Sequence, residues 1–165
     1  MATTLPVPIE FDLPDGWRAA PPDEVGAPGA AFIALHPHPH AGFTANITID
    51  GEYRPDSAPL PEIADGSVAR LRETGASVVL TDRREMGSTE APGLLQRLAV
   101  STTAGGTLRD VVQTQVYLSL LDIEEPQSRV VIRLVLTSAV AQHSMVLGDF
   151  EDFVRTVRPR TDSAS

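Results

Sequence analysis

Cysteine and lysine are both absent from this chain of 165 residues. Without cysteine there is no disulfide, no thiolate nucleophile, no zinc–thiolate site and no lipid attached through sulfur. All thirteen basic residues are arginine, which also excludes lysine Schiff-base catalysis and the lysine of a phosphate-binding P-loop.

Long apolar runs are absent too. No stretch approaches the roughly 18 apolar residues of a membrane-spanning helix, and residues 1–17 have neither the basic nor the apolar region of a secretory signal. The net charge is −9, and the acidic residues are spread along the chain. This charge disfavours nucleic acid and anionic membrane surfaces as partners. We therefore expect a cytoplasmic protein with no nucleic acid and no membrane among its partners.

The residues that are present fit one globular domain. Hydrophobic residues make up 42% of the chain and charged residues 21%, which is enough to bury a core without metal or disulfide support. No internal repeat divides the sequence. We predict a single domain over residues 1–165, with an ordered core at about 7–159 and a frayed tail at 160–165.

The first half of the chain predicts three strands and a helix. Apolar and polar residues alternate at 7–13 and 43–49, and 30–36 is a short apolar strand. Within 43–49 and the next residue, one side of the strand is polar and carries Thr44, Asn46, Thr48 and Asp50. Near-helical spacing then predicts a central helix from residue 60 to a C-cap at Gly75.

The second half predicts an antiparallel meander and a closing helix. Short turns separate four β-rich segments, which are 77–86, 93–102, 108–120 and 129–138. The fold class is therefore α+β, with about seven strands in a mainly antiparallel sheet and a central and a C-terminal helix packed on it.

The closing helix is predicted at 148–159. Asp149 can cap its first turn, Asp152 occupies the reciprocal capping position, and Pro159 ends it. A single apolar stripe must dock on the sheet and consists of Phe150, Phe153, Val154 and Val157.

Three of the four histidines alternate with two prolines between residues 36 and 40. On a flat strand His36, His38 and His40 would share one face, but residues before proline favour extended or polyproline backbone, which splays such positions apart. No carboxylate or thiolate flanks them. We interpret the segment as a solvated loop between two strands, with no metal and no cofactor. Weak transition-metal binding is the alternative.

Nothing in the sequence has the spacing of a catalytic site. His143 precedes Ser144, but neighbours in sequence seldom face each other, and no G-x-S-x-G elbow presents a nucleophile. We expect His143 to be a polar residue in the approach to the last helix. We assign no catalytic residue and expect that the protein is not an enzyme, with a histidine-dependent metalloenzyme as the least favoured alternative.

One polar set in the meander is a candidate partner-binding face. Two helices are few to cover both faces of a seven-stranded sheet, so part of one face is expected to be open. The candidate residues alternate with apolar ones on neighbouring strands and are Arg97, Gln113, Gln115, Tyr117 and Arg133. The alternative is an ordinary solvated face of an antiparallel sheet.

The order of elements resembles the PsbP/Mog-like fold family, especially its small bacterial members of the LpqN and DcrB type. The resemblance covers about residues 7–159. It rests on the motif Leu13-Pro14-Asp15-Gly16-Trp17, on "FTANITI" at 43–49, on the central helix and meander, and on "FEDFVRTVRP" at the end. It implies that Trp17 is a packing residue and that the role is binding or accessory, with no catalytic set to transfer. Unlike the LpqN type, this chain shows no signal peptide and no lipidation cysteine.

Two functions follow as hypotheses. The first is a non-catalytic protein-binding, adaptor or chaperone-like domain whose partner is an unidentified protein or, as a homodimer, a second copy of the chain. The alternative is a small-molecule carrier with an apolar pocket between the sheet and the C-terminal helix.

Overall fold

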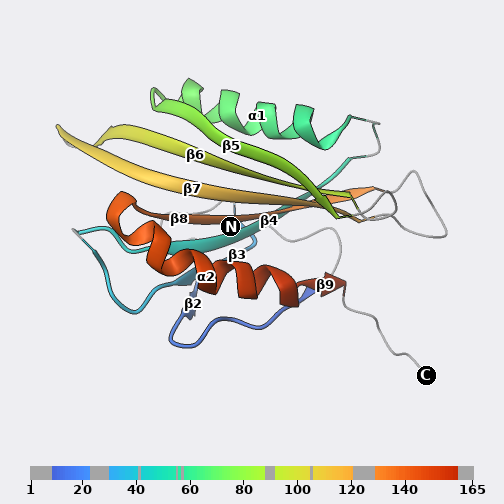
Figure 1. The fold of residues 1–165 in the computed structure, drawn as a ribbon, viewed down its shortest axis with the longest axis horizontal. Helices are drawn as coiled ribbons and strands as arrows, with labels where there is room; N and C mark the ends of the chain where they lie inside the picture. The colour runs from blue at the N-terminus through green and yellow to red at the C-terminus, as the bar shows by residue number, and fades with distance from the viewer. Residues whose placement is uncertain are drawn as a thin grey trace.

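A seven-stranded antiparallel sheet with one helix on each side forms the structure (Figure 1). This computed structural model describes residues 9–22, 30–40, 42–54, 56, 58–87, 92–104, 106–120 and 129–159. Across the sheet the strands are β2 (Arg18–Ala20), β3 (Phe32–Leu35), β4 (Asn46–Tyr53), β8 (Val130–Ala139), β7 (Thr107–Leu120), β6 (Pro92–Ala104) and β5 (Ser77–Gly87). The predicted α+β class and the antiparallel meander β5–β6–β7–β8 are confirmed.

Helix α1 (Leu60–Glu73) lies on one face of the sheet, mainly over β5, β6 and β7. Its apolar side meets the sheet in two clusters, one around Leu94 and Tyr117 and the other around Leu98. It ends close to the predicted position: the C-cap is Thr74, and Gly75, the predicted C-cap, follows it with a φ of 93°, a conformation that glycine adopts without strain. We call this side of the sheet the α1 face.

Helix α2 (Val140–Thr156) lies on the opposite face, over β8 and β7 (Figure 1). The predicted apolar stripe docks there: Phe150 and Phe153 are each 1% exposed and pack in the largest core cluster, against which Val154 and Val157 are partly buried. We call this side the α2 face.

The predicted start and caps of the last helix are wrong. The helix begins at Val140, directly after β8, with Ala139 as an N-cap that makes no side-chain hydrogen bond. Asp149 therefore lies inside the helix. Asp152 forms an exposed ion pair with Arg155 at 2.9 Å. The helix ends at Thr156, before Pro159. No glycine or proline separates β8 from α2, so the sequence carries no punctuation at that boundary.

The first predicted strand is much shorter than expected. Within 7–13 only β1 (Ile9–Glu10) is a strand, and it pairs with β9 (Arg158–Pro159) in a separate two-stranded sheet. Residues 7 and 8 lie outside the described residues, as does the predicted tail 160–165. Strand β2, which was not predicted, forms one edge of the main sheet. No helix in the described ranges is both long and apolar enough to cross a membrane.

Trp17 closes one end of the core on the α2 face, as the resemblance implied. Its side chain is 5% exposed. Its indole Nε1 donates to Asp149 Oδ2 at 3.1 Å. The hydrogen bond joins the segment before β2 to the middle of α2.

Candidate functional site

Helix α1 leaves part of its own face open. Beside it, over β4, β8 and β7, lies a hollow of about 230 Å³. Its lining is mostly amide and hydroxyl side chains and consists of Asn46, Thr48, Leu71, Gln113, Gln115, Arg133, Val135 and Thr137. We call this hollow the α1 groove. A smaller hollow of about 60 Å³ lies nearby, lined in part by Asp50, Ser67 and Arg70.

The pairing of three strands places the groove side chains in rows. Residues directly opposite in neighbouring strands point to the same face, and every second residue repeats the pattern. Across β4, β8 and β7 the rows are Asn46–Thr137–Gln113, Thr48–Val135–Gln115 and Asp50–Arg133–Tyr117. The groove floor is therefore a regular grid set by strand register.

Beneath α1 the grid continues as a buried hydrogen-bond network. Tyr117 is 1% exposed, and its hydroxyl lies 2.6 Å from Ser67 Oγ and 2.9 Å from Gln115 Oε1. Burial raises the pKa of Tyr117 above its ordinary value of 10, against the lowering effect of the Ser67 hydrogen bond. The phenol therefore stays protonated at neutral pH and helps to fix α1 on the sheet.

Two glutamines link this network to an exposed ion pair and to the groove. Gln96 Nε2 donates to Gln115 Oε1 at 2.7 Å, and Gln96 Oε1 accepts from the Arg83 guanidinium at 2.6 Å. Arg83 in turn pairs with Asp65 of α1 at 2.7 Å. At the other end, Gln115 Nε2 donates to Gln113 Oε1 at 2.9 Å. The Gln113 carbonyl oxygen is therefore engaged, which leaves its amide nitrogen for other partners.

Arg133 is the cation of the groove. Its Nε and one terminal nitrogen donate to Asp50 Oδ2 at 3.1 and 2.8 Å, and the other terminal nitrogen donates to Ser67 Oγ at 3.2 Å. Burial alone would lower the pKa of Arg133, but the Asp50 carboxylate outweighs it and the net shift is upward. The guanidinium stays charged and holds its position between β4 and α1.

The five predicted face residues do not share one exposed surface. Gln113 and Arg133 line the α1 groove and are half-buried, whereas Gln115 and Tyr117 are each 1% exposed. Arg97 points to the other face, because it pairs with Thr114 while its neighbour Gln96 pairs with Gln115. Whether any of the five binds a partner stays a prediction.

Sequence reasoning missed several groove residues, namely Asn46, Thr48, Leu71, Val135 and Thr137. A signal for the first two was present, since the strict alternation of 43–50 places its polar side chains on one face. The alternation does not indicate which strand lies beside β4. That strand is β8, and the paired residues range from Tyr53 and Val130 to Asn46 and Thr137, which are far apart along the chain.

A second polar cluster is sealed on the α2 face. His143, which was expected before the last helix, lies inside α2 and is 6% exposed. Its Nδ1 is 2.6 Å from Ser138 Oγ and its Nε2 is 2.8 Å from Thr114 Oγ1, both of which belong to fully buried residues. Burial, with a smaller effect from the charge of Arg97, lowers the pKa of His143 to about 4. The imidazole is neutral and serves packing rather than solvent contact.

The histidine-rich segment connects β3 to β4, as predicted. His38 and His40 are exposed, and His36 is half-buried against the edge of the Trp17 ring, with centroids 5.1 Å apart. The backbone N–H of His38 donates to His36 Nδ1 at 3.1 Å. Among the described residues no three histidine, aspartate, glutamate or cysteine side chains converge as metal ligands.

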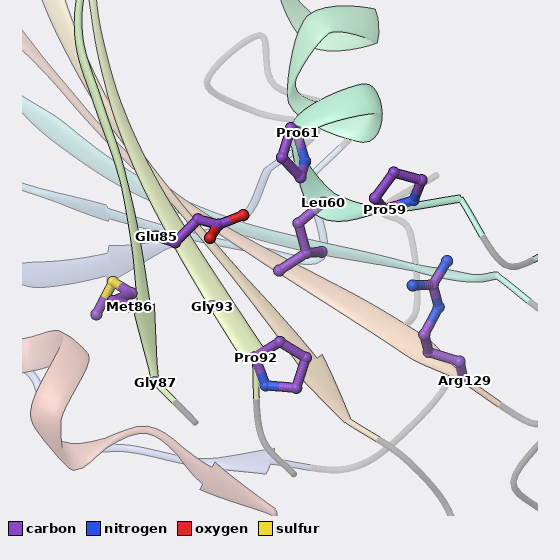
Figure 2. Close-up of a pocket in the computed structure, with 9 residues that line it drawn as sticks. All are labelled: Pro59, Leu60, Pro61, Glu85, Met86, Gly87, Pro92, Gly93 and Arg129. Atoms are coloured by element: carbon purple, nitrogen blue, oxygen red, sulfur yellow. The ribbon is translucent and has the colours of Figure 1, made fainter. Parts of the chain in front are cut away.

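A larger hollow of about 540 Å³ lies at the end of the sheet, where α1 begins (Figure 2). Its lining is proline-rich and consists of Pro59, Leu60, Pro61, Glu85, Met86, Gly87, Pro92, Gly93 and Arg129. Arg129 is already engaged, since its guanidinium donates to the carbonyl oxygens of Arg54 and Asp56 at 3.2 and 3.0 Å. None of these three hollows is lined by a residue of α2.

Comparison with known proteins identifies the fold. No family model matches the sequence, and no curated protein matches it. Solved structures do match. LpqN of Mycobacterium tuberculosis, described as involved in cell envelope biogenesis, superposes with a TM-score of 0.61 at 16% identity over 93% of this chain and 86% of that one.

Two further structures are similar. The cyanobacterial PsbP protein CyanoP of Synechocystis sp. PCC 6803 has a TM-score of 0.57 at 12% identity, covering 92% of this chain and 86% of that one. PA94 of Pseudomonas aeruginosa, a protein of unknown function, has a TM-score of 0.58 at 18% identity, covering 78% of this chain and 82% of that one. The chain therefore has the PsbP/LpqN-like fold.

Proposed function

We propose that this chain is a non-catalytic accessory domain of the cytoplasm that binds a segment of a partner protein in the α1 groove. The observation that carries the proposal is a set of half-buried polar groups on the groove floor that have no partner within the described residues. They are the hydroxyls of Thr48 and Thr137 and the amide nitrogen of Gln113. Polar groups in a hollow of this kind contribute most to the free energy of binding when a ligand forms hydrogen bonds with them.

The chemistry of the groove suits a polypeptide. Carboxamides offer both donors and acceptors, as do hydroxyls, and they match the alternating N–H and C=O groups of an extended chain. Leu71 and Val135 add apolar contact area beside them. This mixture is typical of protein–protein interfaces, which are no more apolar than ordinary protein surface.

The absence of a role in catalysis is also part of the proposal. A serine and a histidine do meet at Ser138 and His143, but both side chains are buried, and no carboxylate of the residues that the structure describes hydrogen-bonds to the imidazole. A nucleophile needs access to its substrate. Of the three similar structures, none is named as an enzyme, which supports the same interpretation.

A pair of arginine substitutions tests the groove. Thr137→Arg places a long cation in the groove, and Met145→Arg places the same side chain on α2, where Met145 is 71% exposed. Partners retained from a bacterial lysate by the natural chain are identified by mass spectrometry, and the purified partner is then titrated calorimetrically. We expect Thr137→Arg to weaken binding by about tenfold or more and Met145→Arg to leave it unchanged. Equal binding by both variants would contradict the proposal.

A carrier function is the second candidate, and the hollow at the start of α1 favours it. Its volume of about 540 Å³ is within the range of small-molecule pockets, roughly 300–1,000 Å³. It lies at the opposite face from the α2 pocket that the sequence hypothesis assumed. Native mass spectrometry of the purified chain would show a co-purified ligand, and Pro61→Trp, which fills the hollow, would remove it. An unliganded natural chain that also fails to bind apolar probe dyes would exclude this candidate.

A further inference from the structure

The outer edge of the sheet at β5 is long, and no strand of the described part of the chain lies beside it. Strand order places β5 last, paired only with β6. It has 11 residues, whereas β2 at the other edge has 3. Among the described residues seven large apolar side chains are exposed, and three of them belong to β5: Val79 at 56%, Leu80 at 40% and Met86 at 39%. The carbonyl oxygen of Val78 accepts from Arg72 of α1 at 3.0 Å. Beyond it, unpaired backbone groups together with apolar side chains make this edge a surface that can accept another strand.

Two opposite charges stand near the middle of this edge. Asp82 and Arg84 are exposed, and neither side chain makes a hydrogen bond or ion pair with the described residues. Both point to the α2 face, because they pair with Arg97 and Leu95 of β6. Arg83 between them points to the α1 face, where Asp65 and Gln96 hold its guanidinium.

The order of these residues makes the edge complementary to itself. When two copies of one strand pair antiparallel about a two-fold axis, one residue must lie opposite its own copy. With Arg83 at that position, Asp82 faces Arg84 of the second copy, and Arg84 faces its Asp82. Arg83 lies opposite its own copy, but Asp65 and Gln96 hold each Arg83 guanidinium on the α1 face. Centring the axis on Asp82 or Arg84 would instead set two like charges without such partners opposite each other.

The bulge in β5 limits how far such pairing extends. The register with β6 shifts between Leu80 and Asp82, so the strand bends there. Edge bulges and edge charges are both devices that prevent indiscriminate pairing. Here they leave a short straight ladder in which the register centred on Arg83 places each Asp82 opposite an Arg84 of the second copy.

We propose that a second copy of this chain pairs antiparallel with β5 about Arg83, joined by two reciprocal Asp82–Arg84 ion pairs. This inference is independent of the function proposed for the α1 groove, because the outer edge of β5 contributes no residue to that groove. The contact is short and falls below the roughly 1,200 Å² of a stable interface. The dimer is therefore reversible, forms at about 100 µM and weakens with salt.

Charge reversal tests the register. Sedimentation velocity from about 10 µM to 1 mM measures the dimer dissociation constant of the natural chain. Asp82→Arg and Arg84→Asp should each raise it by about tenfold or more, because each reversal turns two attractive pairs into two repulsive ones. The double variant restores both pairs in reversed polarity and should return the constant to within about threefold of the natural value.

A control variant and a check of folding complete the design. Asp152→Arg makes the same reversal on α2, where Asp152 is exposed, and should leave the dimer unchanged. The fluorescence of Trp17, the single tryptophan, shows that each variant keeps its core. A natural chain that stays monomeric at about 1 mM would overturn the proposal. So would a folded double variant that dimerises no better than the single ones.

Discussion

At the scale of single residues, several buried polar side chains stabilise the fold through hydrogen bonds to side chains of neighbouring elements. Tyr117 illustrates the point, because its hydroxyl contacts both Ser67 of α1 and Gln115 of β7. We expect Tyr117→Phe to lower the free energy of unfolding by about 1–2 kcal/mol, since it removes these hydrogen bonds and keeps the ring. Urea denaturation measures the change. A cost near zero would show that the hydroxyl does not help to hold α1 on the sheet.

His143 makes the stability of the folded chain depend on pH. Its pKa is about 4 in the folded chain, compared with the ordinary value of 6.5, so the unfolded chain binds the proton more readily. The stability that the neutral imidazole contributes is therefore complete above pH 6.5 and is lost as the pH falls toward 4. We expect a loss of at most about 3 kcal/mol over this range. Denaturation of the natural chain and of His143→Gln at pH 7, 6 and 5 checks this, and parallel curves for the two would contradict it.

At the scale of elements, α2 exists because its apolar stripe docks on the sheet. A helix of 17 residues is marginal in isolation, and packing supplies most of its stability. Phe153 is 1% exposed, so Phe153→Ala should cost about 3–5 kcal/mol, whereas the exposed His38→Ala should change stability by less than about 0.5 kcal/mol. Denaturant melts of the two variants measure both. A larger loss of stability from His38→Ala than from Phe153→Ala would contradict the interpretation of α2 as a core helix and of the histidine-rich segment as a surface loop.

The helices and strands also show which features of the fold could be predicted from the sequence and which could not. Alternation and helical spacing are local, so they predicted the meander, α1 and the Phe150–Phe153 stripe. The start of α2 was missed because packing, and not a capping side chain, determines it. Strand register is a long-range property. It assigns Arg97 to one face and Gln113 to the other, and it places Asn46 beside Thr137, which no local pattern indicates.

At the scale of the whole molecule, the two helices share one sheet. Helix α1 packs on β7 through Tyr117, and α2 packs on β7 and β8 from the other side. Removing either helix would expose strands that hold the other, so we expect a single cooperative unfolding transition. Trp17 reports the α2 side by fluorescence, and far-ultraviolet circular dichroism reports all elements together.

The two signals should therefore give one urea midpoint, in the natural chain and in two core variants of opposite faces. Leu94→Ala enlarges the α1-face core and Phe150→Ala the α2-face core, since Leu94 is fully buried and Phe150 is 1% exposed. Each substitution should lower the urea midpoint measured by both signals. The shift should correspond to a loss of about 2–5 kcal/mol in the free energy of unfolding. If Leu94→Ala lowered the urea midpoint measured by circular dichroism but not the midpoint measured by Trp17 fluorescence, α1 would unfold on its own. The α1 groove, which takes one wall from that helix, would then open and close independently of the rest of the fold.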